Sequence, residues 1–154
     1  MGQPTLNGYQ LKKGQPPEDI TMALSPSGAW ASGGMVSTPA ELNTFIRAYV
    51  GGRLFGSTVQ NAQRQFVAGS SGPPGPGTNS AGLAIYRYQT KCGTVFGHTG
   101  NFPGYTMFAA ATSDGSRSVV VAINTQLNAK KPVSAAYTAL RSVESTAVCA
   151  AVDG

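Results

Sequence analysis

The chain has 154 residues, enough for one domain with a buried core. Hydrophobic residues make up 41% and charged residues only 11%, well below the roughly 25% that is usual for globular proteins, and there are 20 Gly and 10 Pro. This balance argues against a helical bundle and against a disordered chain, and it predicts tightly turned loops between apolar segments.

The net charge of +5 does not indicate nucleic-acid binding, because the lysines and arginines are scattered and form no stripe with interleaved aromatic residues. A modest positive field favours anionic substrates such as carboxylates. The chain has no run of 18 apolar residues and no signal-peptide pattern, so we expect no membrane span. With one histidine and no Cys-x-x-Cys, it has too few ligands for a zinc site, and we expect no metal or cofactor.

The first 28 residues have no clear period and are expected to be irregular, apart from a short strand around Ile20–Leu24. Ser25–Gly28 is expected to form a turn. A strong helix signal follows: Thr38 can cap, Pro39 suits the first helical position and Glu41 completes a capping box. One apolar helical face is then formed by Leu42, Phe45, Ile46, Tyr49 and Val50, before Gly51-Gly52 ends the helix.

Ser57–Gln60 resembles a second capping box, which predicts a shorter helix to about Val67. The Gly-, Ser- and Pro-rich segment 69–80 is expected to be an exposed loop. We interpret it as a long loop and not as a linker between domains, because neither flank alone looks like a complete domain.

Beyond this loop the pattern changes to strands, expected at residues 82–89, 94–97, 105–112 and 117–124. A turn is expected at 91–93 and a hairpin turn at 113–116. Together these segments predict an antiparallel meander of three to four strands. A closing helix is expected over residues 132–148, because apolar residues recur there at helical spacing: Ala136, Leu140, Val143 and Ala147.

Two cysteines, Cys92 and Cys149, form either a disulfide or two buried thiols. The disulfide is the favoured interpretation, since Cys149 at the end of the closing helix can reach Cys92 at a sheet edge. Closing a loop of that length with a disulfide would stabilise the fold by roughly 4 kcal/mol. A disulfide would also place the protein outside the cytosol, in the cell envelope or the extracellular space.

The only histidine, His98, follows a predicted strand and stands between Gly97 and Gly100. A lone histidine is usually structural. Here the flanking glycines allow the backbone to approach a ligand closely, and Thr99 and Asn101 add short hydrogen-bonding side chains.

The stretch Gly97-His98-Thr99-Gly100, with Gly104-Tyr105 after it, resembles the third motif of the serine β-lactamases and D-alanyl-D-alanine carboxypeptidases. Most of that family has Lys-Thr-Gly, and His-Thr-Gly is typical of the branch with secreted actinomycete carboxypeptidases. Segment 29–38 is similar to the segment that lies beside the active site in members of that branch. The resemblance covers residues 8 to 150, and Cys92 and Cys149 look like the disulfide of that branch.

The resemblance implies an α+β fold, an antiparallel meander flanked by helices within an α/β sandwich. His98 would orient the substrate carboxylate and assist proton transfer, and Thr99 would hydrogen-bond that carboxylate. The backbone N–H of Asn101 would stabilise the oxyanion, although the family often has a hydroxyl residue there. Gly100 would be one of the substrate-binding residues. Trp30 would form an aromatic wall, and a core tryptophan is an equal alternative.

The family nucleophile lies in Ser-x-x-Lys, and no lysine of this chain has a serine three residues before it. The second family motif, Tyr-x-Asn, is also absent from these 154 residues. We therefore expect residues 1–154 to be the C-terminal part of such a domain, partnered by an N-terminal segment that carries both motifs. Alone, the meander would expose an unpaired edge and an apolar face, so the isolated chain is expected to aggregate or to be tightly partnered.

The resemblance implies acyl transfer through a serine ester, with D-alanyl-D-alanine peptides as substrates and β-lactams as acylating ligands. The chain would be enzymatic only when completed by the missing segment. The alternatives are a non-catalytic module that binds peptidoglycan peptides, an esterase or β-lactamase of the same family, and a small β-rich domain in which His-Thr-Gly is accidental.

Overall fold

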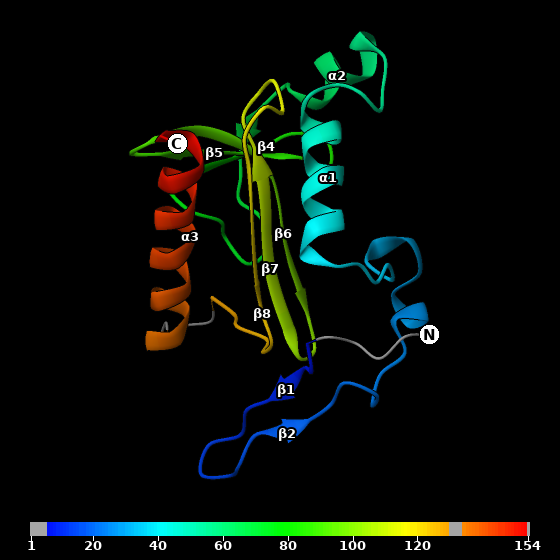
Figure 1. Ribbon diagram of the computed structural model, residues 1–154, viewed down its shortest axis with the longest axis vertical. Coiled ribbons are helices and arrows are strands. Elements are labelled where there is room, and N and C mark those ends of the chain that lie inside the picture. Colours follow the sequence, from blue (N-terminus) through cyan, green and yellow to red (C-terminus); the bar gives the residue numbers. More distant parts are fainter. Residues whose placement is uncertain (1–5, 130–133, 154) are drawn as a thin grey trace.

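The computed structural model describes residues 6–129 and 134–153. Its centre is an antiparallel sheet that lies between two helices, α1 (Pro39–Val50) on one face and α3 (Ala135–Asp153) on the other (Figure 1). Two hydrophobic cores lie on the two faces of this sheet, and alternate residues of β7 (Tyr105–Ala111) belong to one or the other. Ala109 and Ala111 pack with α1, whereas Phe108 and Ala110 pack in the cluster that holds Val148 of α3. This is the predicted α+β sandwich.

The sheet has six strands among the described residues, and each pairs with the next strand along the chain. They are β3 (Val67–Ala68), β4 (Thr78–Ala81), β5 (Tyr86–Thr90), β6 (Gly93–Phe102), β7 (Tyr105–Ala111) and β8 (Ser118–Ile123). The meander is confirmed, but the predicted number of strands is too small. β4 reads Thr-Asn-Ser-Ala, a polar sequence with no strand pattern, and it forms because its backbone pairs with β5. The strand expected at 82–89 is therefore the β4–β5 turn followed by most of β5.

Helix α1 begins as predicted. The Thr38 hydroxyl accepts from the Glu41 backbone N–H at 3.2 Å, and the Glu41 carboxylate accepts from the Thr38 backbone N–H at 2.8 Å. Ile46 and Val50 are buried against the sheet, whereas Phe45, expected on the same face, is half exposed.

The capping box expected at Ser57 is wrong. Helix α2 (Ser57–Gln63) has Gly56 at its N-cap and no side-chain cap. Gln60 instead donates to the Val50 carbonyl at 3.2 Å and ties α2 to the end of α1. The helix stops at Gln63, short of the predicted end, because Val67 and Ala68 pair with β4 as strand β3.

The closing helix packs on the sheet as expected, but its buried face differs from the predicted one. The buried residues are Tyr137, Leu140, Glu144 and Val148. Val143 is 54% exposed, so of the predicted stripe only Leu140 is buried. The alanine-rich sequence defines no sharp apolar stripe, and a glutamate in the buried row breaks the pattern that would have revealed it.

The N-terminal region contains a two-stranded ribbon of β1 (Tyr9–Gln10) and β2 (Glu18–Asp19). The Tyr9 N–H donates to the Asn124 carbonyl at 2.9 Å, which places β1 beside the end of β8. The strand expected around Ile20–Leu24 is wrong, because the chain turns there and the Ala23 N–H donates to the Ile20 carbonyl. The turn expected at Ser25–Gly28 opens a 3₁₀ helix, η1 (Pro26–Ser32).

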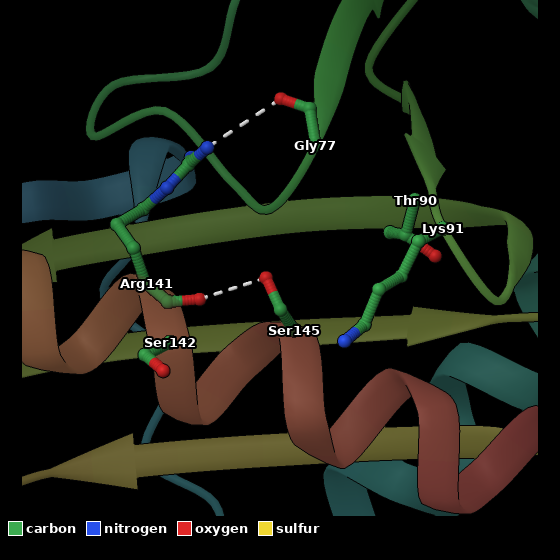
Figure 2. A pocket seen from close by; sticks show the side chains of 6 residues that line it. All are labelled: Gly77, Thr90, Lys91, Arg141, Ser142 and Ser145. Carbon is green, nitrogen blue, oxygen red and sulfur yellow. Dashed lines mark hydrogen bonds between the residues drawn. The ribbon is translucent and has the colours of Figure 1, made fainter.

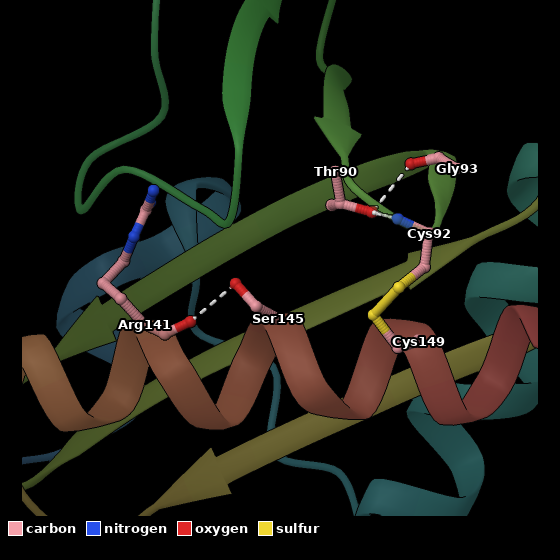
Figure 3. Close-up of a disulfide and its surroundings, with 6 residues drawn as sticks. All are labelled: Thr90, Cys92, Gly93, Arg141, Ser145 and Cys149. Atoms are coloured by element: carbon pink, nitrogen blue, oxygen red, sulfur yellow. Dashed lines mark hydrogen bonds between the residues drawn. A yellow bond between two sulfur atoms is a disulfide. The ribbon is translucent and has the colours of Figure 1, made fainter.

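The β5–β6 turn lies beside α3 (Figure 2). A disulfide between Cys92 in this turn and Cys149 in α3 joins them, with 5.1 Å between the Cα atoms (Figure 3). The structure thus contains the expected disulfide. Among the helices of the described residues, none has the length and apolar character required to cross a bilayer.

Candidate active site

The His-Thr-Gly stretch lies in the second half of β6, where the strand has a partner on one side only. Pairing with β5 ends at Gly97, opposite Tyr86, whereas pairing with β7 continues to Phe102. The predicted strand was too short, since β6 includes the whole motif. Residues 98–102 therefore form an open strand edge beyond the end of β5.

The register decides which backbone groups this edge presents. β5 and β6 are joined by a two-residue turn between Thr90 and Gly93, so the odd-numbered residues of β6 direct their N–H and C=O toward β5. Beyond Gly97 there is no β5 residue to receive them. The backbone groups of Thr99 and Asn101 consequently point out of the open edge. An unpaired N–H in such a position can stabilise a developing oxyanion.

The His98 ring is held by its neighbour. Its Nδ1 lies 2.5 Å from the Thr99 carbonyl oxygen, which can only accept, so Nδ1 carries the proton. In the neutral ring, Nε2 is then the basic nitrogen. The ring also packs edge-on against Tyr86, with 4.9 Å between centroids. His98 remains solvent exposed, and no sequence pattern indicated its contact with Tyr86.

Thr99 lies on the opposite face of the strand from His98 and is only 4% exposed. Its hydroxyl donates to the Pro73 carbonyl at 2.6 Å. That bond commits its only hydroxyl proton to the loop between β3 and β4. Donation to a substrate carboxylate would require the Pro73 carbonyl to move away. Pro73 carried no sequence signal for such a role, because segment 69–80 was expected to be an exposed loop. That expectation is wrong in part, since Ser71, Pro73, Gly75 and Pro76 are buried.

The Asn101 side chain forms hydrogen bonds with other residues of the chain. Its amide donates to the Leu127 carbonyl at 3.1 Å and to the Asn128 side-chain oxygen at 2.7 Å. The Thr106 hydroxyl, opposite Asn101 on β7, donates to the Thr125 carbonyl at 2.9 Å, lies 3.3 Å from the Asn101 side-chain oxygen and accepts from the Leu127 N–H at 2.8 Å. These contacts fix the segment after β8 to the end of β6 and occupy the Asn101 amide, so Asn101 offers a ligand its backbone groups and not its side chain.

The glycines of the motif permit close strand packing. A Cβ built at Gly97 would lie 2.0 Å from the Ala109 carbonyl oxygen, a distance that no side chain can occupy. At Gly100 the nearest group would be the flexible Met107 side chain. The β6–β7 hairpin closes at Pro103-Gly104, where the positive φ of Gly104, +85°, suits the third position of a type II turn.

Trp30, expected as a wall of the cleft, is not brought into contact with the His98 region among the described contacts. It lies in η1 with a positive φ of +47° and is 87% exposed. Other apolar side chains of the same segment are also exposed, Met22, Leu24, Met35 and Val36. The assignment of Trp30 to a binding wall stays a prediction.

The structure thus has an antiparallel sheet between two helices, with His-Thr-Gly on the open edge of an inner strand. The chain belongs to the Beta-lactamase family, whose sequence profile matches residues 3–144.

Two solved structures share this fold. The D-stereospecific amidohydrolase from Streptomyces sp. is 31% identical to the chain, with a TM-score of 0.70 over 86% of this chain and 38% of that one. The D-amino acid amidase from Ochrobactrum anthropi SV3, solved with D-phenylalanine, is 24% identical, with a TM-score of 0.66 over 77% and 36%. The chain thus spans less than two fifths of the length of either protein.

Proposed function

We propose that the chain is the C-terminal part, residues 1–154, of a serine-type hydrolase domain that acts through an acyl-enzyme. The observation that carries the proposal is the open edge of β6, which presents the Asn101 N–H in the strand that also holds His98. Both the edge geometry and the family membership support an acyl-transfer site at this edge.

In the proposed reaction a serine outside these residues attacks the carbonyl carbon and gives its proton to a basic group of its own segment, and the charge that develops on the carbonyl oxygen is stabilised by the Asn101 N–H. The C–N bond then breaks, the amine leaves with a proton, and water hydrolyses the serine ester. His98 assists proton transfer by accepting a proton at Nε2. Once Nε2 carries that proton, it donates to the substrate carboxylate and orients it. Gly100 lets the substrate backbone approach the strand. The Thr99 hydroxyl joins the substrate carboxylate only after it leaves the Pro73 carbonyl.

We infer a substrate with an amide bond beside a D-configured residue. The names of the two similar structures, a D-stereospecific amidohydrolase and a D-amino acid amidase, support this class. Within it, a D-alanyl-D-alanine carboxypeptidase that β-lactams acylate is the finer proposal, on the ground of the His-Thr-Gly motif. The Cys92–Cys149 disulfide supports a location outside the cytosol.

The proposed partner is a segment that carries Ser-x-x-Lys and Tyr-x-Asn. Its docking is supported by the apolar side chains of residues 22–36, where no residue is buried and where Trp30 and Met35 are almost fully solvated. Such a concentration of exposed large apolar residues is unusual for a free surface.

The test is intact mass spectrometry of the natively purified protein after incubation with a fluorescent penicillin. We expect an acyl adduct on a serine outside residues 1–154. His98→Gln should slow labelling by at least about tenfold, as is typical when a proton-transfer group is lost. Gln89→Ala, an exposed change on neighbouring β5, should not slow it.

A sample that shows no adduct on any polypeptide would contradict the proposal. Binding of a D-alanyl-D-alanine peptide in that unlabelled sample would favour the non-catalytic binding module instead.

A further inference from the structure

A groove of about 390 Å³ lies between α3, the β5–β6 turn and the loop that precedes β4 (Figure 2). It is near the beginning of β6, whereas the candidate active site occupies the second half of that strand. Six residues line it: Gly77, Thr90, Lys91, Arg141, Ser142 and Ser145.

The lining contains two cations and no carboxylate. Across the part of the chain that the structure describes, the ion pair formed is Lys12–Glu18, so Lys91 has no anionic partner there. The nearest acidic residue along α3, Glu144, is buried on the sheet-facing side of the helix and does not line the groove. The charge of Lys91 is therefore not neutralised by the walls of the groove, whereas Arg141 has the buried Glu144 within electrostatic reach.

Arg141 is fixed in place by the opposite wall. Its guanidinium donates to the Pro74 carbonyl and, at 3.4 Å, to the Gly77 carbonyl. These carbonyls neutralise no charge, and a guanidinium has five N–H donors, so further donors remain for a ligand. Figure 2 shows the Arg141 side chain extending from α3 toward Gly77, while Lys91 extends from the β5–β6 turn toward α3. The two cations thus approach the groove from opposite walls.

The disulfide holds these walls together. Cys92 directly follows Lys91, and Cys149 lies one helical turn after Ser145 (Figure 3). The Thr90 hydroxyl donates to the Gly93 carbonyl at 2.8 Å and accepts from the Cys92 N–H, which fixes the turn. Because the turn and the helix are linked covalently, the backbones that carry Lys91 and Arg141 are held at a fixed separation before any ligand binds.

We propose that this groove is a binding site for an extended phosphate-bearing anion, with one anionic group at Lys91 and a second at Arg141. An ammonium and a guanidinium with spare donors are the groups that proteins use for phosphate oxygens. Because the two cations lie on different walls, a ligand with two linked anionic groups can contact both. This site is independent of the proposed hydrolase activity, since it shares no residue with the open edge of β6.

The test is calorimetric titration of the purified full chain with inorganic diphosphate at low ionic strength. Lys91→Gln should weaken binding about tenfold, the loss expected for one charge-assisted hydrogen bond. Lys13→Gln removes the same charge from an exposed position in the ribbon turn and should change the affinity by less than about twofold. Cys92→Ser combined with Cys149→Ser should also weaken binding, because the backbones that carry the two cations are then no longer held at a fixed separation.

A second arm separates two sources of the ligand. Tighter binding of a short phosphodiester oligomer than of diphosphate would assign the groove to a polymer, and the reverse order would assign it to a free anion. Absence of binding of both probes at millimolar concentration overturns the proposal. Equal weakening by Lys91→Gln and Lys13→Gln also overturns it, because binding would then follow only the net charge of the chain.

Discussion

Glu144 is a buried carboxyl whose ionisation should control the stability of the α3–sheet contact. It is 1% exposed, and its Oε2 has no hydrogen-bond partner among the described residues. Burial raises the pKa of Glu144 from its ordinary 4.5 to about 7, and the nearby Arg141 opposes this shift. The phenols of Tyr88 and Tyr137 lie within electrostatic reach and have their own pKa values raised, chiefly by burial.

The direction of the pH dependence follows from these values. Below pH 4.5 the carboxyl is neutral in both the folded and the unfolded chain, and the folded state carries no penalty. Between pH 4.5 and 7 the unfolded chain ionises first, so stability falls as the pH rises. Above pH 7 the loss is complete, and at about 1.4 kcal/mol per pKa unit it amounts to about 3 kcal/mol.

Glu144→Gln removes this ionisation while keeping the shape of the side chain. The variant should match the native protein at pH 4 and be more stable by up to about 3 kcal/mol at pH 8, which for a domain of this size raises Tm by about 6–12 °C. Thermal unfolding of the purified protein between pH 4 and 8.5 measures the difference, with Glu18→Gln as an exposed control. If the native and Glu144→Gln curves stay parallel across this range, or if the variant is less stable at pH 8, the reasoning is wrong.

Three further predictions concern stability and can be checked by urea unfolding at constant pH. Gly97→Ala should destabilise the fold by about 1–3 kcal/mol or more, because the added methyl meets the Ala109 carbonyl, whereas Gly100→Ala should cost less because Met107 can move; equal losses would contradict the close approach. Thr38→Ala should lower the free energy of unfolding by about 1 kcal/mol, because it removes the side-chain cap of α1. Ser57→Ala should leave the free energy of unfolding unchanged, since Ser57 makes no cap. A large loss for Ser57→Ala would show that Ser57 does cap α2. Cys92→Ser with Cys149→Ser should lower the free energy of unfolding by roughly 4 kcal/mol; an unchanged midpoint under non-reducing conditions would show that the bond does not constrain the unfolded chain.

Local chemistry in the sequence was sufficient to place several elements. The Thr38–Glu41 capping box located the start of α1 because both of its hydrogen bonds lie within one turn of helix. The turn signals around Gly115 and the valine run after it located the β7–β8 hairpin for the same reason. The disulfide followed from the family resemblance and from the relation of Cys92 and Cys149 to the sheet edge and the helix.

Features that depend on distant partners could not be predicted. β4 is a strand only because β5 pairs with it. The Ser57 motif forms no capping box, and the Gln60 side chain donates to the Val50 carbonyl at the end of α1 instead. In the candidate site, the sequence indicated which residues gather on β6 but not which way they face. That Thr99 is buried on the Pro73 carbonyl depends on a residue 26 positions earlier in the chain.

The strand order also bears on how the chain reaches its fold. Every pair of neighbours in the main sheet is consecutive along the sequence, so β3 to β8 can form as successive hairpins, each closing a short loop. Contacts of this local kind form rapidly, whereas docking β1 against the end of β8 must wait for a segment more than a hundred residues away. Amide protection should therefore develop in the strands of the main sheet before it develops in the N-terminal ribbon, so that β6, the strand that holds His98, forms before β1 docks beside β8.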